Sequence, residues 1–153
     1  MRNKSILKFL SWWPPFLGAG IRVREMSPKL DRVEVEMKLT WWNRNYVGTH
    51  YGGSLYSMCD PFMMLMLIER LDRNYIVWDK SAQIKFKKPG RGTVRATFQL
   101  PDKEIERIKK ALETQNKIEP TYLIEIKDSQ NEVIAEVEKV IYIRNKNSSK
   151  TSS

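Results

Sequence analysis

Alternation of apolar and charged residues marks the first strands of this chain. Residues 33–39 place Val33, Val35, Met37 and Leu39 opposite charged neighbours, which is typical of a strand with one buried and one solvated face. Residues 21–24 alternate in the same way and predict a shorter strand before it. Residues 43–53 carry three glycines and two asparagines, so they predict a loop.

The stretch from 54 to 71 has a different pattern, because it is apolar on nearly every side and rich in Met and Leu. A helix that is hydrophobic all round must be buried all round, so we expect a central helix here. Pro61 lacks the N–H that a helix ladder needs, and it predicts either a kink or an early-turn position.

The second half of the chain predicts four more strands, at 75–88, 94–100, 122–126 and 133–144. In the first of these, Trp78, Ala82, Ile84 and Phe86 are expected to share one face. The "PGRG" at 89–92 predicts a turn, and Pro101-Asp102 opens a surface helix with an apolar stripe. Together the elements predict an α+β fold, in which an antiparallel sheet of about six strands curls around one buried helix.

The 153 residues favour a single domain at 18–144, preceded by a helical lead at 1–17 and followed by a disordered polar tail at 145–153. The start "MRNKSILKFLSWWPPF" superficially resembles a signal peptide, but it has no small-residue cleavage site. We interpret it as a short amphipathic helix packed on the body and expect no membrane contact, with a membrane-surface contact as the weaker alternative. The longest apolar run, residues 55–68, is interrupted and shorter than the roughly 20 residues that a membrane span needs.

The net charge of +9 is compatible with a polyanionic partner, either nucleic acid, anionic lipid or a phosphate-rich cofactor. No nucleic-acid-binding module is evident, so we expect no nucleic-acid partner. Cys59 is the only cysteine, which excludes an intrachain disulfide and favours a cytoplasmic protein with a buried, inert thiol. With one histidine and one cysteine, we expect no metal site.

One motif carries the functional prediction. It reads N-x-x-G-T-x-x-G-G-x-x-x-x-x-x-D and consists of Asn45, Gly48, Thr49, Gly52, Gly53 and Asp60. It resembles the active-site signature of hotdog-fold acyl-CoA thioesterases, particularly the phenylacetyl-CoA type. The segments "PPFLGAGI", "GGSLYSM-DPF", "YIVWDK" and "KPGRGTV" are similar to an uncharacterised branch of unknown function. The resemblance covers roughly residues 18–144 and implies a long central helix wrapped by a curved antiparallel sheet.

The resemblance implies that Asp60 is the general base or the nucleophile, and apolar surroundings would raise the pKa of its carboxyl. The alternatives are that Asp60 caps a helix that begins at Pro61, or that it has another buried polar role. The Gly52-Gly53 pair ahead of a helix can offer N–H groups to a developing oxyanion, or can serve only a tight turn. Asn45 is expected either to bind the attacking water or the thioester oxygen, or to form an Asx turn.

The sequence departs from the thioesterase pattern at the histidine that normally precedes the glycine pair, because that position is Tyr51 and His50 lies one residue early. His50 is therefore a candidate catalytic residue whose alternative is local packing. Further candidate substrate-binding residues are Gly48, Thr49, Tyr51, Gly52, Ser54, Lys87, Lys88 and Arg91. The basic members of this set suit the phosphates of coenzyme A, although a solvated strand face is the first interpretation of them.

These observations favour hydrolysis of a fatty or aromatic acyl thioester, with no cofactor besides the coenzyme A moiety of the substrate. The substrate is expected to be an acyl-CoA or an acyl-carrier thioester. The resemblance implies a homodimer, or a dimer of dimers, with active sites at the subunit interface. The alternative is a non-catalytic acyl- or lipid-binding hotdog protein.

Overall fold

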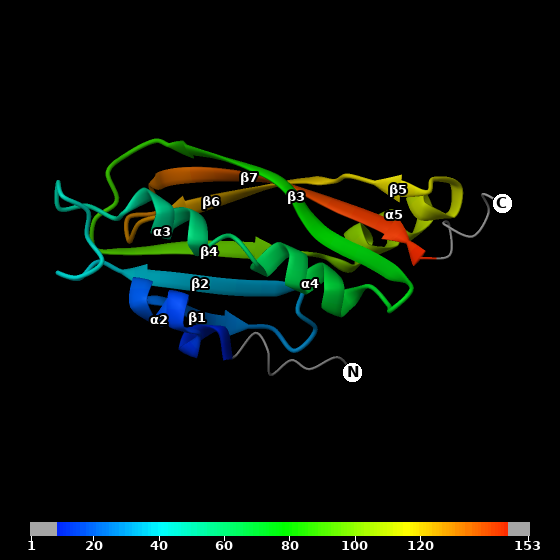
Figure 1. The fold of residues 1–153 in the computed structure, drawn as a ribbon, viewed down its shortest axis with the longest axis horizontal. Helices are drawn as coiled ribbons and strands as arrows, with labels where there is room; N and C mark the ends of the chain where they lie inside the picture. The colour runs from blue at the N-terminus through cyan, green and yellow to red at the C-terminus, as the bar shows by residue number, and fades with distance from the viewer. Residues whose placement is uncertain (1–8, 147–153) are drawn as a thin grey trace.

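Seven antiparallel strands form one curved sheet in the computed structural model, which describes residues 9–146 (Figure 1). Their order across the sheet is β1-β2-β4-β6-β7-β3, and the short β5 pairs with β7. The strands are β1 (Ile21–Met26), β2 (Arg32–Lys38), β3 (Tyr75–Phe86), β4 (Thr93–Gln99), β5 (Lys117–Ile118), β6 (Thr121–Lys127) and β7 (Val133–Asn145). The α+β class is confirmed, while β5 was not predicted because two residues show no periodicity.

The predicted alternation of β2 is confirmed, because Val33, Val35 and Met37 are fully buried. In the antiparallel register these three residues face Phe98, Ala96 and Val94 of β4, which are buried as well. Paired residues of neighbouring strands share one face of a sheet, so these six side chains form a continuous apolar layer of the core.

The central helix lies on this apolar face, but it is two helices rather than the single helix predicted for residues 54–71. Helix α3 (Gly52–Ser57) and helix α4 (Phe62–Arg70) are separated by a turn at residues 58–61. Pro61 has no N–H to donate to the carbonyl of Ser57, which explains why the ladder is interrupted there. Phe62, Met66 and Leu67 are fully buried against the sheet.

The expectation that this helix is buried all round was wrong. Met64, Leu65 and Ile68 of α4 are only partly buried, although Met64 and Leu65 also pack against the core. Met58, Met63 and Met66 are core residues, where a flexible thioether side chain fills gaps between its neighbours.

Strand β3 lies at one edge of the sheet and contains a bulge between Asp79 and Ser81. The extra residue changes which side chains face the core: Ala82, Ile84 and Phe86 share one face, but Trp78 points to the other side. There Trp78 stacks on Tyr142, with ring centroids 4.3 Å apart. The predicted grouping of Trp78 with the other three was therefore wrong, and Asp79 takes its place on the inner face.

At the N-terminal side, a 3₁₀ turn η1 (Leu10–Trp12) precedes the short helix α2 (Pro14–Ala19). Of α2 only Phe16 is buried. The amphipathic helix predicted at the start of the chain falls largely on residues 1–8, which lie outside the described residues. Helix α5 (Asp102–Thr114) buries Ile105, Ile108 and Leu112, as the apolar stripe predicted. Strand β7 continues to Asn145, the residue at which the disordered tail was predicted to begin. The rest of that tail, except Lys146, lies outside the described residues, and so do residues 1–8 of the predicted lead.

Candidate functional site

The loop between β2 and α3 is fastened to the body by the amide of Asn43. Its Oδ1 accepts a hydrogen bond from the Thr40 N–H at 2.7 Å. Its Nδ2 donates to the carbonyls of Ala19 at 2.9 Å and Lys38 at 2.8 Å. Asn43 therefore ties the loop both to the end of β2 and to the end of α2.

Asn45 organises the second half of the same loop. Its Oδ1 accepts from the N–H groups of Val47 at 3.1 Å and Thr49 at 3.0 Å, which makes the predicted Asx turn. Its Nδ2 donates to Thr49 Oγ1 at 2.9 Å and to the carbonyl of His50 at 3.3 Å. A side-chain amide has two hydrogens and two lone pairs, so these four bonds use all of them and favour the loop-stabilising interpretation of Asn45.

His50 is only 3% exposed, and its ring connects the loop to the turn at residues 89–92. Nε2 lies 2.9 Å from the carbonyl of Gly92, so Nε2 carries the hydrogen and Nδ1 is left as an acceptor. Burial lowers the pKa of His50, partly opposed by this backbone hydrogen bond. The buried neutral ring matches the local-packing interpretation of His50.

The glycine pair lies against two aromatic rings rather than in a tight turn, since neither glycine has a positive φ. A Cβ on Gly52 would lie 2.9 Å from Cζ of Phe86, and a Cβ on Gly53 would lie 2.5 Å from Cε1 of Tyr51. Tyr51 occupies the N-cap position of α3 and is exposed, as is Phe86. The first N–H groups of a helix have no partner within the helix, so this turn exposes amide donors beside the two rings.

Asp60 lies in the turn that separates α3 from α4, not inside a helix. Its side chain is 50% exposed, so the expected apolar burial was wrong. The N-cap of α4 is Pro61, and no side chain makes a capping hydrogen bond there, so the capping alternative was wrong as well. Instead, Asp60 Oδ1 accepts a hydrogen bond from the hydroxyl of Tyr56 at 2.9 Å.

Lys139 is the other partner of Asp60, and it is fully buried in the middle of β7. Its Nζ donates to the Asp60 carbonyl at 2.5 Å and to Asp60 Oδ1 at 3.1 Å. Asp79 Oδ1 completes the cluster at 2.9 Å from the same ammonium, and the ring of Tyr56 lies 5.7 Å from it. A buried ammonium is tolerated only when its donors are paired, and these oxygens supply the partners.

The cluster of Tyr56, Asp60, Asp79 and Lys139 perturbs the groups within it. Burial raises the pKa of Asp79, and the Lys139 ammonium only partly offsets this. Burial and the hydrogen bond to Asp60 raise the pKa of Tyr56, so the phenol stays protonated as a donor. One ammonium thus faces two carboxylates and one neutral hydroxyl.

Lys139 and Asp79 were not identified from the sequence. A signal for Lys139 exists, because it occupies the same alternation phase of β7 as Val137 and Ile141, where an apolar residue belongs. Asp79 offers no such signal, because the bulge that turns it inward is not visible in the alternation of β3.

Several of the predicted residues line one groove of about 540 Å³ between the loop and the "KPGRG" segment. The lining includes Asn45, Thr49, His50, Gly52, Lys87, Lys88 and Arg91, but not Asp60, Gly48, Tyr51, Gly53 or Ser54. Lys87 pairs with Glu136 at 3.0 Å and Lys88 with Glu132 at 2.6 Å. The groove and the Asp60 carboxylate are therefore distinct parts of this chain.

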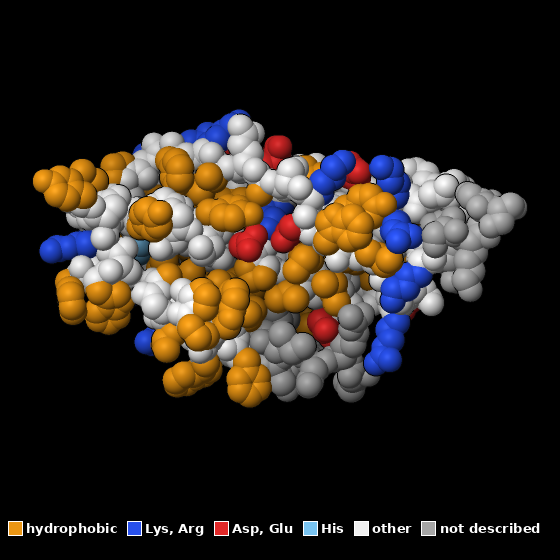
Figure 2. Space-filling model, in the orientation of Figure 1, with side chains coloured by type: hydrophobic (Ala, Val, Ile, Leu, Met, Phe, Trp, Pro, Cys, Tyr) orange, Lys and Arg blue, Asp and Glu red, His pale blue; other side chains and the backbone are white. Residues whose placement is uncertain are grey.

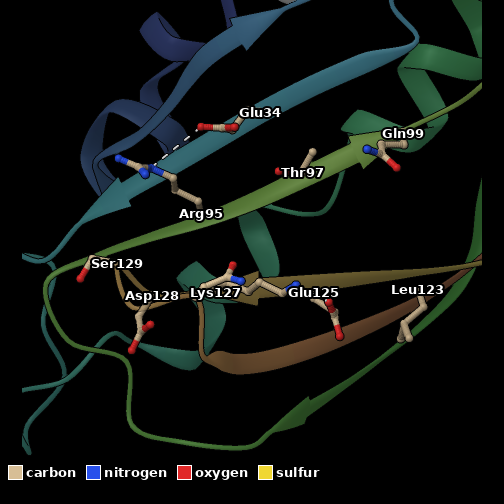
Figure 3. A pocket seen from close by; sticks show the side chains of 10 residues that line it. Glu34, Arg95, Thr97, Gln99, Leu123, Glu125, Lys127, Asp128 and Ser129 are labelled. Carbon is tan, nitrogen blue, oxygen red and sulfur yellow. Dashed lines mark ion pairs between the residues drawn. The ribbon is translucent and has the colours of Figure 1, made fainter.

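A second groove, of about 620 Å³, lies on the opposite face of the sheet (Figure 3). Arg95, Thr97 and Gln99 line it, and they alternate along β4 with residues that are buried in the core. Strands β4 and β6 pair at only two positions, so the groove occupies the space where they diverge. Its lining mixes both charge signs, with Arg95 Nε 3.9 Å from Glu34 Oε1, and it contains none of the predicted site residues.

Within residues 9–146, no cluster of three or more His, Cys, Asp or Glu side chains could hold a metal ion. No helix in that range is long and apolar enough to cross a membrane. Cys59 is fully buried, and burial raises the pKa of its thiol, as expected for an inert cysteine.

The chain matches the profile of one protein family over most of its length. Residues 3–143 match DUF4442, described as a domain of unknown function. No curated protein matches the sequence.

Solved structures share the fold. A Pseudomonas aeruginosa protein described as a probable thioesterase superposes with a TM-score of 0.82 at 20% identity, covering 94% of this chain and 96% of that one. A Haemophilus influenzae thioesterase gives a TM-score of 0.68 at 15% identity, covering 95% and 93%. A Chlorobaculum tepidum protein of unknown function gives 0.71 at 17% identity, covering 92% and 93%. The chain therefore has the hotdog fold and belongs to the DUF4442 family.

Proposed function

We propose that this protein hydrolyses an acyl thioester with Asp60 as general base or nucleophile. The observation that carries the proposal is the Asp60 carboxylate itself, half-exposed at a helix break and oriented by Tyr56 and Lys139. A carboxylate that is both fixed and open to solvent suits attack on a bound carbonyl better than a purely structural role. Structural neighbours that are named thioesterases support the same chemistry.

In the general-base route, Asp60 takes a proton from water while the water oxygen attacks the thioester carbon. The carbonyl oxygen gains the negative charge, and the amide donors at Gly52 and Gly53 would stabilise it. The C–S bond then breaks, and Asp60 returns its proton to the leaving thiolate. In the nucleophile route, an Asp60 oxygen attacks the carbon, the thiolate leaves, and water cleaves the resulting anhydride.

A homodimer is part of this proposal. Strand β3 is a twelve-residue edge strand, and such an edge can pair with another strand. The apolar side of α4 that carries Met64 and Leu65 is only partly covered within one chain. Because Asp60 does not line the groove of its own chain, we propose that the glycine loop of one subunit faces Asp60 of the other.

The substrate carrier is proposed to be coenzyme A or a carrier protein with the same phosphopantetheine arm. Lys88 and Arg91 at the groove can meet phosphates, since Arg91 makes only a 3.5 Å contact with the Gly48 carbonyl. Lys88 would exchange its surface partner Glu132 for a phosphate, and exposed ion pairs of this kind are weak.

The test is release of free thiol from short, medium, long and aromatic acyl-CoAs. We expect turnover by the wild type and a loss of about 10²–10⁴-fold in Asp60→Asn, the usual contribution of a positioned acid or base. The matched control is Asp72→Asn, since Asp72 Oδ1 accepts a turn hydrogen bond from the Asn74 N–H that an asparagine can keep. Full activity in Asp60→Asn would exclude the assignment of Asp60.

A non-catalytic acyl-binding protein is the second candidate. The buried His50 favours it, because Tyr51 stands where thioesterases of this kind carry a histidine and the His50 ring is engaged with the Gly92 carbonyl. Saturable binding of an acyl-CoA without thiol release from any substrate would support this candidate over the hydrolase.

The dimer has its own test by light scattering. We expect about twice the chain mass of 18.1 kDa for the wild type. A Leu65→Glu variant should shift the protein toward the monomer, because a charge on the apolar side of α4 cannot be buried unpaired. The exposed Leu123→Glu is the control, since Leu123 lies on the other face of the sheet. A monomeric wild type would remove the interface site.

A further inference from the structure

The loop between β2 and α3 has its polar side chains inside and its aromatic side chains outside. Asn43, Thr49 and His50 are buried, whereas Trp41 is 77% exposed, Trp42 57% and Tyr46 fully exposed. The hydrogen bonds of Asn43 and Asn45 fix this arrangement. The exposure of the aromatic rings is thus built into the loop, although it leaves a large apolar area in water.

A second segment adds apolar residues to the same end of the molecule. Asn43 donates to the carbonyl of Ala19, which places the end of α2 against the loop. Leu17 of this helix is exposed as well. We call Leu17, Trp41, Trp42, Tyr46 and Val47 the aromatic patch. Figure 2 shows hydrophobic side chains gathered at this end, with a basic side chain projecting among them.

The charges around the aromatic patch have one sign. No Asp or Glu occurs in residues 14–20, 37–59 or 80–101, the three stretches that supply helix α2, the loop and the "PGRG" turn. These stretches carry Lys38, Arg44 and Arg91, and none of the three forms an ion pair with a carboxylate of residues 9–146. Contacts from Arg91 to the Gly48 carbonyl and from His50 to Gly90 hold the turn beside the loop.

We propose that this end of the molecule docks on an anionic lipid bilayer. Tryptophan and tyrosine favour the boundary between headgroups and acyl chains, and arginine and lysine beside them meet the lipid phosphates. A contact between two copies of this patch fits less well, because a two-fold axis there would bring Arg44 and Arg91 close to their own copies. The proposal revises the expectation of no membrane contact, and it does not depend on Asp60 or on thioester hydrolysis.

The test uses the full chain with vesicles of phosphatidylcholine alone or mixed with phosphatidylserine. We expect co-sedimentation with the mixed vesicles, a blue shift of tryptophan emission, and quenching by brominated acyl chains. The double variant Trp41→Ser/Trp42→Ser should bind at least about tenfold more weakly. Arg44→Gln/Arg91→Gln should weaken binding to the mixed vesicles only. The control is Trp78→Phe, which removes an exposed tryptophan that stacks on Tyr142 and should bind like the wild type.

Three results would overturn the proposal. One is no binding of the wild type to either vesicle. Another is equal weakening by Trp78→Phe and by the loop variant, which would show a non-specific effect of tryptophan loss. The third is conversion of a wild-type dimer into a monomer by the loop variant, which would assign the patch to a second copy of the chain. Circular dichroism of each variant establishes that it is folded, because Ser at these exposed positions removes none of the loop's hydrogen bonds.

Discussion

The loop at residues 40–51 and the helix break at residues 58–61 each contain residues of the predicted motif, and their polar atoms bind different kinds of partner. In the loop, Asn43 and Asn45 direct their amides mostly at backbone groups of the same neighbourhood. At the break, the Asp60 carboxylate meets only side chains, one of them from a strand 79 residues away. The loop residues hold a shape, while Asp60 keeps half of its surface for another molecule.

The difference shows that a motif residue is not functional merely because it belongs to the motif. Asn45 and His50 have no free hydrogen on their side chains once their internal bonds are made. Asp60 has an exposed carboxylate, and the Gly52-Gly53 turn has amides at a helix start. We therefore expect substitutions in the loop to act on stability and substitutions at the break to act on activity.

The largest expected stability effect is that of Asn43→Ala. It leaves the Thr40 N–H and the carbonyls of Ala19 and Lys38 without a partner, so we expect a loss of about 3 kcal/mol in the free energy of unfolding. Urea unfolding of Asn43→Ala and Asp60→Asn side by side provides the measurement. Asp60→Asn should change stability far less, because an amide oxygen still accepts from Tyr56 and Lys139. A larger loss of stability in Asp60→Asn than in Asn43→Ala would contradict the distinction between a structural loop and a functional Asp60.

A smaller effect is expected for Lys139→Met, which removes the buried ammonium between Asp60 and Asp79. We expect a loss of about 2 kcal/mol, less than for a fully buried pair because both carboxylates retain access to solvent. The control is Lys80→Met, whose partner Glu119 forms an exposed ion pair at 2.6 Å and should contribute less than about 1 kcal/mol. The measurement is the free energy of unfolding in denaturant. Equal losses for Lys139→Met and Lys80→Met would show that the Lys139 cluster has no structural role.

The smallest effect concerns the glycine pair, and it distinguishes a steric need for glycine beside the Tyr51 ring from a role of the glycine in catalysis. In a Tyr51→Ala background, Gly53→Ala should stabilise the protein by about 0.5–1 kcal/mol, because alanine is the better helix residue and the blocking ring is gone. With Tyr51 present, the close approach to its ring should cancel that gain. The measurement is thermal unfolding of the wild type, Gly53→Ala, Tyr51→Ala and the double variant, which together form a double-mutant cycle. If thiol release falls with Gly53→Ala in both backgrounds, the glycine also serves close approach of a substrate.

Much of the architecture follows from local periodicity. The alternation in β2 and the apolar stripe of α5 each depend on residues within one element, and the structure buries the residues that those patterns indicate. The interruption at Pro61 has a local cause too, because the missing N–H of proline acts on its own turn. The sequence did not predict that the helix would be interrupted completely, with Asp60 exposed in the turn between α3 and α4.

Tertiary structure alone decided the surroundings of Asp60. Lys139 reaches it from β7, and Asp79 turns inward only because a bulge shifts the phase of β3 by one residue. Likewise, Asn43 of the loop points inward because carbonyls of α2 and β2 converge there. The sequence determined which segments are strands and helices, because the backbone geometry of each element sets the spacing of its apolar residues within a few positions. Which polar groups meet was decided by the sheet register, because those contacts join residues that are distant along the chain.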